Sequence, residues 1–224
     1  MEKSIQSELS SYIGRLFRDN FGKGPASVYV SIKADYVVIH LRDFLAPMER
    51  VLVSKHQNVM VEETRDLLME ELLPDIKATL RVRLDTEIDE LYYDWSLSNR
   101  SGIILARINA NELKEEDDYP EKDNVHEAIC RVTEEAEKQP RSVQSFFAND
   151  RTLVVFREGI LVTIEKELIR TGFEEHLKIT KRHLEKKLLH AAGFEEILKR
   201  GVEDIFVDWD FQRDKSYIIF TLKP

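Results

Sequence analysis

The spacing of apolar residues along the chain predicts helices and strands in an order that occurs twice. Apolar residues recur at helical intervals over residues 4–19, and short β-branched runs at 28–32 and 36–41 then predict an antiparallel hairpin. A short helix near residues 47–57 and a long one from about residue 61 follow, and two further strands end the set. The predicted order is helix, strand, strand, helix, helix, strand, strand.

The strongest similarity between the two copies lies in the last two strands of this set. Residues 91–95 (LYYDW) return as residues 205–209 (IFVDW), and each copy is followed by a polar break and a second apolar run. The offset is 114 residues here and 116 at the earlier match of Leu72 with Leu188, so the second copy lacks two residues near Gly193. The chain is therefore predicted to be a tandem duplication. Its parts are a first repeat at residues 1–110, an acidic linker at 111–124 and a second repeat at 125–224.

The second copy follows the same order of elements as the first. We expect a helix at residues 125–138, strands at 143–147 and 152–156, a short helix at 165–170 and a long helix at 177–200. The hairpins favour antiparallel pairing. Each copy is thus predicted to be an α+β unit, an antiparallel four-stranded sheet with helices on one face. The register of the second strand is ambiguous by one residue, so Arg42 is not paired with Arg157.

The long helix of the first copy combines an apolar stripe with an interruption. Leucine or isoleucine recurs every four residues from Leu68 to Ile88, which is typical of a face packed on a core. Pro74 lies inside this stripe. A proline removes a backbone hydrogen bond and clashes with the preceding turn, so we expect Pro74 to kink the helix or to begin a new one.

Charge and composition narrow the classes of function. The net charge is −9, and more than half of the acidic excess lies in the linker at residues 111–124. Neither repeat has the basic surplus that binding to a phosphate backbone needs, so no nucleic-acid partner is expected. The apolar runs are far shorter than the roughly 20 residues that span a bilayer, and the N-terminal residues lack the apolar region of a secretory signal.

Cys130 is the only cysteine of the chain. It allows no intrachain disulfide and no cysteine-based zinc site within one chain. A reducing, cytoplasmic location is therefore expected. The motifs of common hydrolases, metalloproteases, nucleotide-binding proteins and redox enzymes are missing from the sequence. We expect a non-catalytic protein with no catalytic residues, no metal site and no cofactor.

The duplicated Asp-Trp pairs are the first candidates for a site. They are Asp94-Trp95 and Asp208-Trp209. Neighbouring strand residues point to opposite faces, so if the tryptophan packs under the helices the aspartate faces away from them, and the reverse also holds. One hypothesis places the two aspartates in a ligand site between the repeats, for a cation or a cationic partner. The alternative, which the residues favour, is a structural aspartate at a strand end beside a tryptophan that anchors the core.

Glu49 and Glu165 also occupy equivalent positions, in the first turn of the short helices. A carboxylate there interacts favourably with the helix dipole, which is a structural explanation. A contact with a ligand or partner is the other hypothesis. No second titratable residue stands at a fixed spacing to form an acid–base pair.

One predicted helix carries the only strongly basic surface. His176, His183 and His190 recur every seven residues, which separates neighbours by about 10 Å along a helix, too far for two to share one metal ion. A solvated helix face is the simpler interpretation. The alternative is a docking surface for an acidic partner or anionic lipid, formed by Lys178, Lys181, Arg182, His183, Lys186 and Lys187.

Several stretches together form a recognisable pattern. The first copy contains Gly22, Gly24, Pro25, Ser27, Val28, Leu45, Pro47, Glu49, Arg65 and Asp94. The second copy keeps Pro140, Ser142, Val143, Gly159, Leu161, Glu165, Arg182, Asp208, Phe220 and Leu222. This pattern resembles the MpsC family, named for a sodium-translocating system that generates membrane potential. The chain departs from it at Ala46, where the family has threonine, at Thr163, and in the glycines missing before Pro140.

The resemblance covers nearly all of both repeats and implies an accessory or regulatory protein without catalytic residues. It implies a protein partner such as a subunit of a membrane cation or bicarbonate transport system, and a cytoplasmic location peripheral to the membrane. The alternative function is a small-molecule or ion-binding protein, or an enzyme, with a site between the repeats. The sequence predicts no particular oligomeric state.

Overall fold

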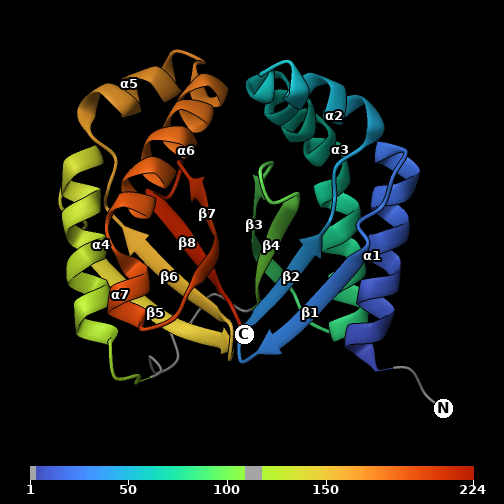
Figure 1. Ribbon diagram of the computed structural model, residues 1–224, viewed down its shortest axis with the longest axis horizontal. Helices are drawn as coiled ribbons and strands as arrows, with labels where there is room; N and C mark the ends of the chain where they lie inside the picture. The colour runs from blue at the N-terminus through green and yellow to red at the C-terminus, as the bar shows by residue number, and fades with distance from the viewer. Residues whose placement is uncertain (1–3, 109–117) are drawn as a thin grey trace. The chain divides into compact units, whose positions relative to one another are not determined.

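The computed structural model describes residues 4–108 and 118–224. The chain divides into two compact units, Met1–Lys114 and Glu115–Pro224. Each unit contains one four-stranded antiparallel sheet together with helices (Figure 1). This architecture confirms the α+β fold and the two similar halves that the sequence predicts.

In the first unit the elements follow the predicted order. They are α1 (Ile5–Phe21), β1 (Ser27–Lys33), β2 (Tyr36–Arg42), α2 (Pro47–Ser54), α3 (Asn58–Leu84), β3 (Ile88–Ser96) and β4 (Ser101–Ile108). The strands lie in the order β1-β2-β4-β3, and each neighbouring pair is antiparallel. Helix α3 runs through Pro74 as one element, so no second helix begins there.

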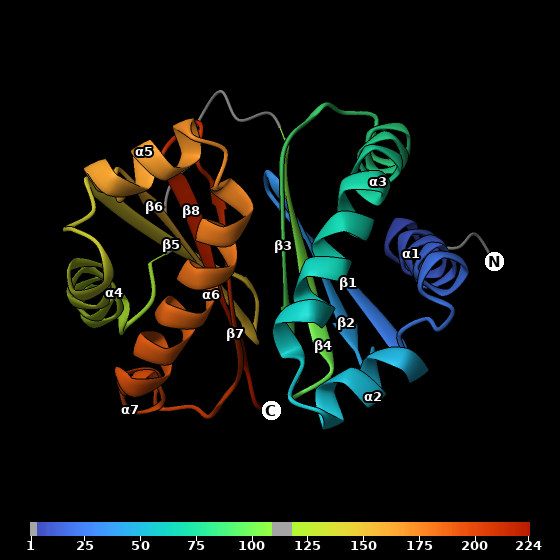
Figure 2. The ribbon, with the colours of Figure 1, turned by 90° about the horizontal axis from the view of Figure 1, so that it is seen from above.

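The helices of the first unit pack on one side of its sheet (Figure 2). Apolar residues of α1, such as Leu9 and Ile13, share a buried cluster with Met69 and Ile76 of α3 and with alternate residues of the strands. Burial of this apolar surface is the main force that joins the two layers. Trp95 belongs to the same cluster and therefore lies on the helix-covered face.

Trp95 also explains why a glycine stands opposite it. Residue 102 of β4 pairs with Trp95 of β3. A Cβ atom built on Gly102 would lie 2.4 Å from a ring carbon of Trp95, which is far inside van der Waals contact. A glycine at residue 102 therefore leaves the room that the indole of Trp95 occupies.

The second unit repeats this plan with one change. Its elements are α4 (Lys122–Ala136), β5 (Ser142–Asn149), β6 (Thr152–Glu158), α5 (Thr163–Arg170), α6 (Glu174–Ala191), α7 (Phe194–Leu198), β7 (Val202–Asp210) and β8 (Lys215–Leu222). The strand order is β5-β6-β8-β7, which matches the first unit. The single long helix predicted at residues 177–200 is wrong, because Gly193 adopts a left-handed φ of 75° and separates α6 from α7.

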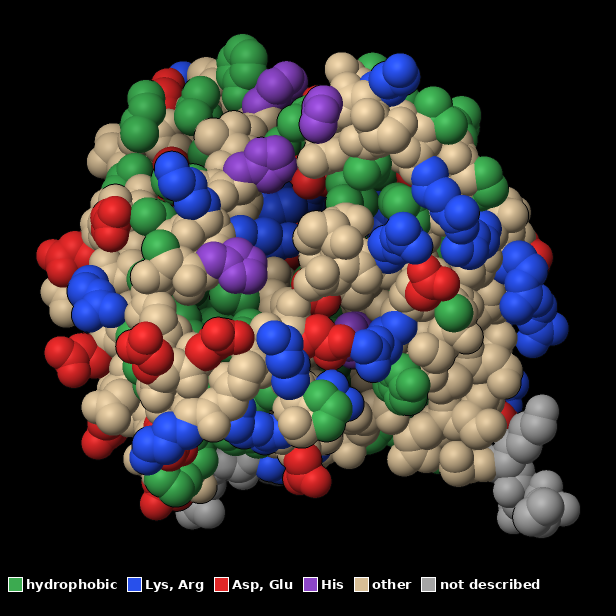
Figure 3. Space-filling view, in the orientation of Figure 1, with side chains coloured by type: hydrophobic (Ala, Val, Ile, Leu, Met, Phe, Trp, Pro, Cys, Tyr) green, Lys and Arg blue, Asp and Glu red, His purple; other side chains and the backbone are tan. Residues whose placement is uncertain are grey.

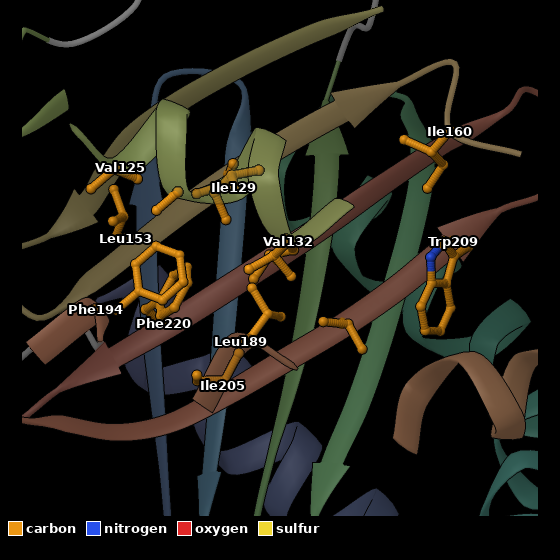
Figure 4. Packing of buried hydrophobic residues seen from close by; sticks show 14 of the residues in the cluster. Val125, Ile129, Val132, Leu153, Ile160, Leu189, Phe194, Ile205, Trp209 and Phe220 are labelled. Carbon is orange, nitrogen blue, oxygen red and sulfur yellow. The ribbon is translucent and has the colours of Figure 1, made fainter. Parts of the chain in front are cut away.

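The core of the second unit lies between its helices and its sheet (Figure 4). Val125, Ile129 and Val132 of α4 enter it from one helix. The separation at Gly193 serves this core, because it places Phe194 against Phe220 of β8 with ring centroids 4.6 Å apart.

Most of the predicted linker lies outside the described residues, but its last part belongs to the second unit. Tyr119 is buried there, and its hydroxyl lies 2.7 Å from the Ser145 hydroxyl. Helix α4 begins at Lys122, three residues before the predicted start.

The strand registers resolve the ambiguity at the second strand of each copy. Leu41 pairs with Gly102 in the first unit, and Arg157 pairs with Ser216 in the second. Gly102 and Ser216 are equivalent because each faces the repeated tryptophan. Arg157 therefore corresponds to Leu41 and not to Arg42, so the two arginines do not occupy equivalent positions.

Candidate functional site

Each unit buries a cation between its first short helix and its tryptophan, and we call these groups the first and second centres. In the first centre, the Arg65 side chain comes from α3 and is 0% exposed. Its Nε and Nη2 atoms each donate to Glu49 at 2.7 Å, which forms a bidentate pair. Glu49 also accepts a hydrogen bond of 2.7 Å from the Ala46 amide, so it ties the start of α2 to α3.

Aromatic rings complete the first centre. The Arg65 guanidinium lies 4.6 Å from the ring centroid of Phe44 and 4.7 Å from that of Trp95. It also donates to the Phe44 carbonyl oxygen at 3.1 Å. Phe17 and Phe21 of α1 pack against the same rings. The buried charge is thus neutralised by one carboxylate and stabilised by two ring faces.

The second centre places a lysine where the first has an arginine. Lys181 follows Arg65 by 116 residues, the same offset that relates Glu165 to Glu49. The Lys181 ammonium donates to Glu165 at 2.7 Å, contacts Glu137, and lies 5.6 Å from the ring centroid of Trp209. Glu165 accepts from the Val162 amide at 2.9 Å, which repeats the cap seen at Glu49.

A second buried cation extends this centre towards the sheet. Arg157 of β6 donates to Glu185 of α6 at 2.5 Å, to the Thr133 hydroxyl at 2.8 Å and to the Ser216 hydroxyl at 2.9 Å. Glu185 also accepts from the Trp209 indole at 3.1 Å and lies 3.7 Å from the Lys181 ammonium. These bonds join α4, α6 and the sheet through one polar network.

The first unit is apolar at the equivalent positions. Thr133, Arg157 and Glu185 correspond at an offset of 116 to Phe17, Leu41 and Met69, and Ser216 corresponds at 114 to Gly102. All three larger residues of the first unit are buried in its core. The same fold therefore accepts either an apolar or an ionic arrangement beside the repeated tryptophan.

Burial shifts the titration of two groups of the second centre. It lowers the pKa of Lys181 to about 8, although Glu185 opposes the shift. Burial also raises the pKa of Glu165, and the hydrogen bond from the Val162 amide opposes that shift. Both pKa shifts have the direction expected where water is excluded, because burial disfavours the charged form of each group.

We expect the pKa of Lys181 to appear in the pH dependence of stability. Between about pH 8 and the ordinary lysine pKa of 10.5, the unfolded chain binds more protons at this residue than the folded chain. The free energy of unfolding should therefore rise with pH across this window. Urea unfolding of the wild type and of Lys181→Met at several pH values isolates the effect. We expect the free energy of unfolding of the wild type, minus that of Lys181→Met, to increase with pH across this window. A value that stays constant or falls as the pH rises would contradict the prediction.

In each predicted Asp-Trp pair, the aspartate and the tryptophan lie on opposite faces of the strand. Trp95 and Trp209 lie in the helix-covered cores, so Asp94 and Asp208 lie on the other face of their strands. Both aspartates are nevertheless buried, at 1% and 5% exposure. Asp208 forms an ion pair of 3.1 Å with Lys178.

The predicted basic face requires correction for two of its six residues. Lys181 and Arg182 are buried, so they do not belong to an exposed surface. Lys181 instead neutralises carboxylates inside the second centre. His183 and Lys187 are exposed on α6, and Lys178 and Lys186 are half-buried. Lys181, rather than Arg182, is the counterpart of Arg65.

Sequence reasoning missed the pairing within the centres. Glu49 and Glu165 were expected to act mainly through the helix dipole, whereas each binds a cation sixteen residues later. The common offset of 116 for the glutamates and the cations is the signal that could have identified both pairs. Arg157 and Glu185 gave no such signal, because the first copy has apolar residues at their positions.

The structure does not assemble a metal centre from the residues that it describes. Residues 4–108 and 118–224 contain no group of three or more His, Cys, Asp or Glu side chains able to hold a metal ion. The Cys130 thiol is partly buried, and burial raises its pKa, which lowers its reactivity. Within the same ranges, no helix has both the length and the apolar content to cross a membrane.

The fold and the two centres define a class of protein: a duplicated α+β repeat in which a glutamate, a buried cation and a tryptophan hold the helices to the sheet. The family model described as "Na+-translocating membrane potential-generating system (MpsC)" matches residues 1–110 and again residues 124–224. The chain belongs to the MpsC family and contains two copies of its domain.

Comparison with known proteins gives one curated relative. The uncharacterized protein YbcI of Bacillus subtilis (strain 168) is 30% identical over 100 residues, which cover 44% of this chain and 79% of YbcI. No solved structure matches the chain.

Proposed function

We propose that this protein is a non-catalytic accessory or regulatory component that acts by contact with a membrane cation or bicarbonate transport system. One observation carries the proposal. The reactive side chains that the two copies share, a glutamate and a cation in each, are buried and bonded to each other. Groups in this state are inaccessible to a substrate, and each compensates the buried charge of the other.

Membership of the MpsC family supports the link to a membrane system. The description of the family names a sodium-translocating system that generates membrane potential. An accessory role is compatible with the absence, in the two described ranges, of a helix that could cross the bilayer, because transport itself would then belong to a membrane-embedded partner.

The alternative function, a ligand site that uses Asp94 and Asp208, remains a prediction. Asp208 is neutralised by Lys178 at 3.1 Å, which leaves less charge to attract a cation and does not favour this alternative.

Affinity purification from detergent-solubilised membranes of the source organism tests the proposal. We expect a membrane-embedded transport subunit to co-elute in a fixed ratio with the tagged protein. A matched purification with an unrelated soluble protein that carries the same tag controls for adventitious capture. Failure to retain any membrane protein, together with unchanged sodium sensitivity of a deletion strain, would contradict the proposal.

A further inference from the structure

The second centre buries one more carboxylate than it buries cations. Three carboxylates meet two cations there, and all five side chains are 10% exposed or less. They are Glu137, which caps the end of α4, Glu165 of α5, Glu185 and Lys181 of α6, and Arg157 of β6. When every group is charged, one negative charge is left without a cation. Water solvates the charged side chains spread over the visible surface (Figure 3), whereas it does not reach this excess.

The first centre has no such excess, and it serves as the matched reference. Its one carboxylate, Glu49, neutralises Arg65 through two hydrogen bonds of 2.7 Å. Phe21 precedes Glu137 by 116 residues and therefore occupies the equivalent position. The extra carboxylate is thus a property of the second copy and is not a requirement of the fold.

Glu137 and Glu165 compete for the same ammonium. Glu137 contacts Lys181 through its Oε1 atom, and Glu165 lies 2.7 Å from the same nitrogen. The Glu137 Oε2 atom is buried and has no hydrogen-bond partner within residues 4–108 and 118–224. An ionised carboxylate deprived of water and donors is destabilised, and two carboxylates that share a site do not both ionise readily. One proton bound by this pair relieves both effects.

Charged groups beyond these five do not remove the excess. Burial raises the pKa of Glu165, and the nearby carboxylates of Glu185 and Asp214 raise it further. Lys138, which is exposed, has a weaker opposing effect on the pKa of Glu165. Asp214 is itself paired with Lys166 of α5 at 3.4 Å, outside the buried group.

We propose that the second centre is a proton-sensitive clasp, which holds α4, α5 and α6 together most firmly when its carboxylates share one proton. The three helices meet at Lys181, because Glu137 reaches it from the end of α4 and Glu165 from the start of α5. Uptake of one proton balances the charge of the centre, and its loss leaves the buried excess that weakens the clasp. The protein thereby responds to the proton concentration around it, independently of the contact with a transport system proposed above.

The direction of the effect on stability follows from proton binding in the two states. Above the ordinary glutamate pKa of 4.5, the folded chain retains at Glu165 a proton that the unfolded chain has lost. The free energy of unfolding should therefore fall as the pH rises from 4.5 towards neutrality. Lys181 has the opposite effect above about pH 8. The second unit should be least stable between these two windows, where all five groups are charged.

NMR titration of the native full-length chain tests the proposal. The chain has two tryptophans, so a proton–nitrogen correlation spectrum shows two indole signals, which Trp209→Phe assigns. The Trp209 indole donates to Glu185 at 3.1 Å, so its signal should shift between about pH 5 and about pH 7. The Trp95 signal should stay nearly constant, because the first centre is balanced. A Trp209 signal that does not move over this range would overturn the proposal.

Glu137→Gln removes the excess charge and keeps the size of the side chain. It should flatten the titration of the Trp209 signal. It should also raise the urea midpoint reported by Trp209, relative to the wild type, more at about pH 7 than at about pH 5. Glu134→Gln alters an exposed carboxylate one turn earlier on α4, so it is the matched control and should change neither result. A Trp209 titration that persists unchanged in the folded Glu137→Gln chain would also overturn the proposal.

Discussion

Replacement of Arg65 by methionine is expected to destabilise the first unit by about 3–5 kcal/mol, because it leaves Glu49 as an uncompensated buried charge. The variant also loses the hydrogen bond of 3.1 Å to the Phe44 carbonyl and the contacts with two aromatic rings. Urea unfolding monitored by tryptophan fluorescence measures the loss, since Trp95 lies against the altered side chain.

Two further variants give the control for Arg65. Arg65→Lys introduces the residue of the second centre and should cost less, about 1–2 kcal/mol, because lysine keeps the charge but loses the bidentate geometry. In a double-mutant cycle, Glu49→Gln combined with Arg65→Met should destabilise by less than the sum of the single changes. Strict additivity would show that the pair does not interact as the structure describes.

Replacement of Arg157 by leucine is expected to destabilise the second unit by about 3–5 kcal/mol. This change removes the ion pair of 2.5 Å with Glu185 and the hydrogen bonds to Thr133 and Ser216. The remaining Glu185 side chain is 1% exposed, and it keeps only the hydrogen bond of 3.1 Å from the Trp209 indole and a contact of 3.7 Å with the Lys181 ammonium to offset its charge. Chemical unfolding of the wild type and the variant at neutral pH provides the measurement.

The first unit supplies the compensating change for Arg157→Leu. Leu41 and Met69 occupy the equivalent positions there, so Arg157→Leu with Glu185→Met converts an ionic arrangement into the apolar one that the fold already accommodates. We expect this double variant to recover about 2 kcal/mol or more relative to Arg157→Leu alone, since a buried ion pair is often replaceable by packed apolar residues. A double variant less stable than Arg157→Leu would contradict this interpretation.

The two centres show how one fold diverges after duplication. Both keep a glutamate at the start of the short helix and a tryptophan in the third strand. The first surrounds its cation with Phe17, Phe21 and Phe44. The second replaces the first two of these with Thr133 and Glu137 and gains a second buried cation, Arg157. The shared glutamate and tryptophan therefore identify what the fold requires at this position. The residues that differ around the cation identify what each copy acquired separately.

Local patterns in the sequence were sufficient for the architecture. Apolar periodicity and the repeated LYYDW-type strand predict the α+β units and their order, because these signals depend on residues close together in the chain. The break between α6 and α7 was missed, since Gly193 in a helical pattern is also compatible with a continuous helix. The left-handed conformation there results from packing Phe194 on β8.

The buried charges were harder to predict from sequence. Lys181 and Arg182 were predicted to belong to a solvated basic face, because lysine and arginine are usually exposed in folded proteins. The burial of Lys181 depends on carboxylates from outside α6, Glu137 and Glu165, which approach it only in the folded unit. Strand alternation predicts that each aspartate lies opposite its tryptophan, and the structure shows which of the two packs under the helices. The burial of the aspartates was not predictable from the strand alone.

The most direct test of the proposed function is sodium-dependent and bicarbonate-dependent growth of a strain that lacks this gene. We expect the deletion to alter sodium sensitivity or the bicarbonate requirement, and the wild-type gene to restore both. A folded Asp94→Asn, Asp208→Asn chain should restore them equally well, because the function depends on contact and not on these carboxylates. A deletion that leaves growth unchanged under every sodium and bicarbonate condition would contradict the proposed link to membrane transport.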